Sequence, residues 1–61
     1  DMKLSQEDRR ILRKVVKLAH MQHYPKDFCT DYEADKMIDV IGRVTIEKLL
    51  RAGKNSNIDN Q

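Results

Sequence analysis

Apolar residues recur at helical spacing along the first third of the chain, over about residues 6–24. At 100° per residue they fall within one arc of about 160°, and basic residues fill the opposite arc. The apolar arc contains Ile11, Leu12, Val15, Val16, Leu18 and Ala19. Ser5 precedes Glu7 and Asp8 in a pattern typical of a helix start. Pro25 disfavours the α conformation at the residue before it, so the pattern predicts an amphipathic helix that ends near Tyr24.

Two shorter helical patterns follow. Thr30 and Glu33 have the spacing of a capping box, and the apolar positions after them predict a helix over about 31–41. If that helix continued through Gly42, the apolar stripes before and after it would point about 130° apart. We therefore place a bend at Gly42 and predict a third helix over about 44–52, which Gly53 is expected to close in a left-handed conformation. The predicted fold class is all-α, a small three-helix module.

The polar ends of the sequence have no helical pattern. We expect residues 1–5 to be a flexible start, residues 6–53 to form a single helical domain, and residues 54–61 to be a polar tail or the start of a linker. We also expect the sequence to be an excised piece of a larger protein.

Composition excludes several classes of protein. Of the 61 residues, 39% are apolar and 36% charged. The sequence has neither an apolar run long enough to span a membrane nor a secretory leader pattern. A single cysteine forms no internal disulfide, and we expect an intracellular protein, cytoplasmic or nuclear. A domain this small has little core with which to enclose a cleft, so we predict no enzymatic activity, no cofactor and no small-molecule substrate.

The width of the first apolar arc indicates association with another protein. The arc is broader than a two-stranded coiled-coil seam, and the apolar content favours a fold completed by self-association or a partner chain. We predict a non-enzymatic protein–protein interaction or oligomerisation module, such as a homodimer. It would bury the apolar arc of the first helix and part of the third against a second chain. The predicted contact residues are Ile11, Leu12, Val15, Leu18, Ala19, Leu49 and Leu50.

Nucleic-acid binding is the alternative function. The basic arc, or a helix-turn-helix around Gly42, would contact the phosphate backbone. The candidate residues are Arg9, Arg10, Arg13, Lys14 and Lys17, with Arg43, Lys48 and Arg51 as a second surface. However, residues 27–39 hold five acidic residues and one lysine, and in an antiparallel hairpin they would neutralise the basic helix. Ile38 and Lys48 also depart from the usual helix-turn-helix pattern, which has a small residue and an apolar residue at these positions.

The remaining candidate chemistry is sparse. His20, His23 and Cys29 have side chains that bind zinc, but a structural site needs four ligands, so we predict no metal. We expect Cys29 to be a partly buried structural thiol and Phe28 to lie in the core. Tyr24 and Tyr32 either close the core or anchor a partner.

Overall fold

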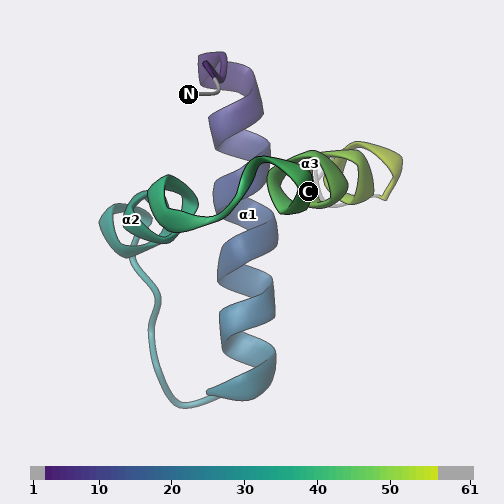
Figure 1. The fold of residues 1–61 in the computed structure, drawn as a ribbon. Coiled ribbons are helices and arrows are strands. Elements are labelled where there is room, and N and C mark those ends of the chain that lie inside the picture. Colours follow the sequence, from purple (N-terminus) through teal and green to yellow (C-terminus); the bar gives the residue numbers. More distant parts are fainter. Residues whose placement is uncertain (1–2, 57–61) are drawn as a thin grey trace.

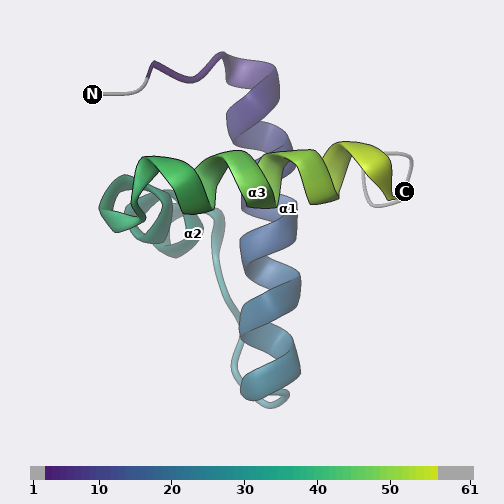
Figure 2. The same cartoon turned by 45° about the vertical axis from the view of Figure 1, so that its right-hand side comes forward.

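The computed structural model describes residues 3–56, which form three helices with no strand among them (Figure 1). Helix α1 spans Gln6–His23, α2 spans Asp31–Val40 and α3 spans Arg43–Asn55. After α1 the connector, residues 24–30, turns back toward α2 (Figure 1). Helix α3 then crosses α1 at a steep angle, as Figure 2 shows. The predicted all-α, three-helix fold is confirmed.

Local caps set the helix ends where the sequence places them. The Ser5 hydroxyl accepts a hydrogen bond from the Asp8 backbone N–H at 3.0 Å, which satisfies one free donor of α1. Thr30 and Glu33 form the complete capping box at the start of α2. At the other end of α1, Tyr24 is the C-cap residue next to Pro25. The two capping patterns and the proline boundary are therefore confirmed.

The chain bends between α2 and α3 at Ile41 and Gly42, which both have extended backbone conformations. Gly42 is the N-cap of α3, with φ of −68° and ψ of 156°, so the predicted bend at this glycine is confirmed. A Cβ atom at Gly42 would meet nothing within 4 Å, and its φ is one that any residue adopts.

The predicted end of the third helix is wrong. Helix α3 continues through Gly53 to Asn55, and no described residue has a positive φ. Gly53 is needed for close approach between helices, because a Cβ there would lie 2.6 Å from Ile11 Cγ2 and 2.9 Å from Val15 Cγ2. Lys54 and Asn55, which we expected in the polar tail, are helical; residues 57–61 of that tail lie outside the described residues.

The core lies where α1 packs against both of the other helices. Its buried residues come from all three helices and the connector: Leu12, Val16, Cys29, Ala34, Ile38 and Ile46. Partly buried apolar side chains surround them, including Leu4, which belongs to the segment expected to be a flexible start. Residues 1–2 of that segment lie outside the described part of the chain. Within residues 3–56 no helix combines the length and the apolar character needed to cross a bilayer.

Candidate functional site

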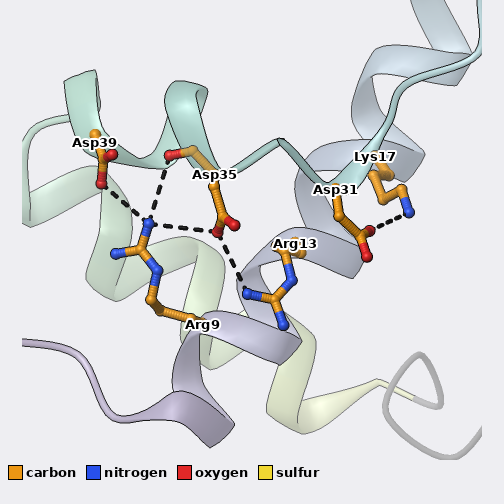
Figure 3. A network of polar contacts seen from close by, with 6 residues as sticks. All are labelled: Arg9, Arg13, Lys17, Asp31, Asp35 and Asp39. Carbon is orange, nitrogen blue, oxygen red and sulfur yellow. Dashed lines mark hydrogen bonds and ion pairs between the residues drawn. The ribbon is translucent and has the colours of Figure 1, made fainter. Parts of the chain in front are cut away.

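Acidic residues of α2 face the basic arc of α1 in an ion-pair ladder (Figure 3). Arg9 Nη2 lies 3.0 Å from Asp39 Oδ1 and 3.4 Å from Asp35 Oδ1. One turn along α1, Arg13 Nη1 contacts the same Asp35 oxygen at 3.3 Å. Cations four residues apart on α1 thus meet acids four residues apart on α2, with the two helices running in opposite directions.

The ladder continues toward the connector. Lys17 Nζ contacts Asp31 Oδ1 at 2.5 Å, and His20 Nε2 lies 3.9 Å from Asp27 Oδ2 (Figure 3 draws the first of these pairs). The predicted neutralisation of the basic helix by the acidic segment is confirmed for Arg9, Arg13 and Lys17. These side chains remain 28–31% exposed, so each pair contributes about 0–1 kcal/mol and mainly determines which helices pair.

Two members of the ladder, Asp31 and Arg9, have shifted pKa values. The hydrogen bond from Lys17 lowers the pKa of Asp31 below its ordinary value. In the same way, the hydrogen bond to Asp39 raises the pKa of Arg9. Both shifts favour the charged forms of these two residues.

The other predicted nucleic-acid residues lie away from this ladder. Arg10 pairs with Glu7 within α1. Lys14, half-buried on α1, forms no hydrogen bond or ion pair with any described residue. On α3 the side chains of Arg43, Lys48 and Arg51 are exposed. The structure therefore separates the basic residues into an α1 set that is mostly paired and an α3 set that faces solvent.

An apolar groove lies where the C-terminal half of α1 meets the other two helices. It has a volume of about 250 Å³. Its walls are Val16, Ala19, His20, His23, Met37, Ile41 and Leu49. The two histidines are the only polar side chains in this set. Such a concave apolar surface is suited to receiving an apolar side chain.

The predicted partner-contact residues divide between the core and this region. Ile11 and Leu12 are 2% and 0% exposed, so the folded chain does not present them to a partner. Val15, Leu49 and Leu50 are half-buried. Only two members of the predicted set are exposed, and these are Leu18 and Ala19. The reason is that α3 crosses α1 near Ile11 and covers the N-terminal part of the apolar arc, leaving its C-terminal part open.

The aromatic residues around the connector lie mostly in solvent. Phe28 is 79% exposed, so the expectation that it lies in the core is wrong. The neighbouring Cys29 is buried in the core. Tyr24 and Tyr32 are 58% and 67% exposed, so neither closes the core.

No described group of His, Cys, Asp and Glu side chains is arranged to hold a metal ion. Comparison with protein-family models, with curated proteins and with solved structures found no match to this chain.

Proposed function

We propose that this chain is a protein-association module that forms a homodimer through the apolar groove and the exposed side of α1 beside it. The docking face is defined by Val15, Leu18, Ala19 and Leu49 together with the other groove residues. The observation that carries the proposal is the groove, whose walls come from all three helices and are apolar except for His20 and His23. Leu18, at the other edge of the apolar arc of α1, is 42% exposed and would be the anchor for a groove on a second copy.

The distribution of charge favours a second copy over a different partner. The sequence has twelve basic and ten acidic residues, yet residues 18–25 contain none of them. In a two-fold symmetric dimer the same patch is used on both subunits, and residues near the axis meet their own copies. A charge there would meet a like charge. The uncharged end of α1 avoids this repulsion. A different partner with complementary charges would not need an uncharged surface here.

The size of the chain is consistent with such an interface. A standard interface buries about 800 Å² on each partner. The chain exposes 4795 Å², so a single face is enough. The buried core contains few large side chains, and the additional apolar contact would stabilise the folded chain by mass action.

Sedimentation equilibrium of the full chain at about 1–100 µM tests this proposal. We expect a dimer whose dissociation follows mass action, and we expect Leu18→Asp to give a helical monomer. Val40→Asp is the matched control, because Val40 is 83% exposed at the end of α2 and does not line the groove. A monomer at every concentration contradicts the homodimer. Dissociation of the Val40→Asp dimer to the same extent would show that the docking face lies elsewhere.

A further inference from the structure

A second exposed surface lies on the outer side of α3, opposite its buried residues Ile46 and Gly53. Exposed side chains follow one another there at helical spacing, namely Val44, Thr45, Lys48, Arg51 and Asn55. Helix α3 lies across α1 with its outer side turned away from the other two helices (Figure 2). This surface is separate from the docking face, which uses the side of α3 that carries Leu49.

The positive charge of the helices is concentrated on α3. Helix α1 has five cations and two anions, whereas α2 has one cation and four anions, so their net charges cancel. Helix α3 has four cations, Arg43, Lys48, Arg51 and Lys54, and a single anion, Glu47. The folded helices therefore present a net positive charge on the α3 side.

Most of the cations of α3 have no partner within the described chain. Lys54 Nζ lies 3.4 Å from Asp8 Oδ1. Arg43, Lys48 and Arg51 form no hydrogen bond or ion pair with residues 3–56. Their positive charges are thus available to phosphates, and each phosphate that they neutralise would release condensed counterions.

We propose that the outer side of α3 docks in the major groove of double-stranded DNA, with Lys48 and Arg51 on the phosphates. The major groove is about 12 Å wide and admits one α-helix. The 13 residues of α3 extend about 20 Å, and α1 crosses behind them. Val44, which is 65% exposed, and Thr45 supply methyl groups for contact with thymine.

The same features favour double-stranded DNA over other nucleic acids. The major groove of A-form RNA is too narrow for a helix, so double-stranded RNA does not offer this site. Single strands are usually bound by aromatic side chains that stack on the bases, and α3 has no aromatic residue. The inference does not depend on homodimer formation, because the exposed cations belong to each single chain.

Fluorescence anisotropy with a labelled duplex of about 25 base pairs tests the proposal at about 50 and 200 mM salt. Two phosphate contacts predict a loss of affinity of about 12-fold between these salt concentrations. Lys48→Glu and Arg51→Glu should each weaken binding by about tenfold and reduce the salt slope by about one. Lys26→Glu is the charge-matched control, since Lys26 is exposed in the connector. It should weaken binding less than threefold.

Three outcomes would overturn the proposal. They are the absence of salt-dependent binding at the lower salt concentration, an equal loss in Lys26→Glu and Lys48→Glu, and equal affinity for single-stranded DNA or double-stranded RNA. Circular dichroism of each variant confirms that the helices are retained. Leu18→Asp separates the two proposals, because it removes the dimer and leaves the outer side of α3 unchanged. Binding of one duplex by this monomer supports the α3 site independently, and a loss of all binding would contradict it.

Discussion

The crossing of α1 and α3 at Gly53 gives the most direct test of the packing. In Gly53→Ala the new methyl group would lie 2.6 Å from Ile11 Cγ2 and 2.9 Å from Val15 Cγ2. Both neighbours are β-branched residues within a helix, where χ1 has one strongly preferred rotamer, so neither methyl group turns away easily. To reach an ordinary contact of 3.4 Å, α3 must move away from α1 by about 0.8 Å.

Two opposing effects determine how much Gly53→Ala changes the free energy of unfolding. Alanine is favoured over glycine inside a helix by about 1 kcal/mol. Overpacking a closely packed contact costs about 1–3 kcal/mol. Because Ile11 is 2% exposed, the atoms around it have little room to move. The cost exceeds the gain, and we expect Gly53→Ala to lower the free energy of unfolding by about 1 kcal/mol. This corresponds to a decrease in Tm of about 4–8 °C for a domain of this size.

Urea unfolding followed by circular dichroism at one fixed protein concentration measures this change. Gly42→Ala is the control, because a Cβ there meets nothing within 4 Å. Alanine is a poorer N-cap residue than glycine, so this change should lower stability by up to about 1 kcal/mol, but Ile11→Leu should recover none of that loss. In a double-mutant cycle with Gly53→Ala, Ile11→Leu should recover part of the loss, since leucine has no Cγ2 atom on Cβ. Stability equal to or above that of the natural sequence in Gly53→Ala would refute the close crossing.

Three further results are expected. Thr30→Ala removes the capping box of α2 and should lower the free energy of unfolding by about 1 kcal/mol, measured by thermal unfolding. Hydrogen bonds from basic side chains lower the pKa of Glu7 and Asp31, and a backbone hydrogen bond lowers that of Glu33. Their stabilisation is complete above the unfolded pKa values and is lost as pH falls through the lower folded values, so Tm should fall below about pH 4.5. A Tm that is constant from neutral pH to about pH 2 would contradict these shifts. Phe28→Ala should change stability by less than about 0.5 kcal/mol, whereas a loss above about 3 kcal/mol would indicate a buried ring.

Helix starts and the bend were predictable because their causes are local. Ser5 and Thr30 lie within three residues of the backbone donors that they satisfy, and Pro25 acts on the residue next to it. The end of α3 was not predictable in this way. A glycine after a helical pattern is equally suited to a left-handed cap and to a close crossing, and only the position of α1 distinguishes the two.

The exposed part of the apolar arc likewise depends on tertiary structure. The spacing of Ile11 and Leu18 places both on one side of a helix, yet α3 covers the first and leaves the second 42% exposed. In the connector, hydrophobicity favoured Phe28 as the buried residue, whereas the compact thiol of Cys29 lies in the core. The charge pattern predicted the helix pairing correctly, because opposite charges at matching spacing indicated that the acidic segment lies against the basic helix.

The ion-pair ladder has one further consequence, which concerns register. Its cations and its acids both repeat every four residues, so a slip of α2 by one helical turn would still pair Asp31 with Arg13 and Asp35 with Arg9. The charges therefore define the direction of the helix pair but leave neighbouring registers nearly degenerate. Side-chain volume removes the degeneracy, because Ala34 and Ile38, also one turn apart, are 0% and 3% exposed. This slip would place the alanine in the space shaped for the isoleucine and leave a cavity in the core.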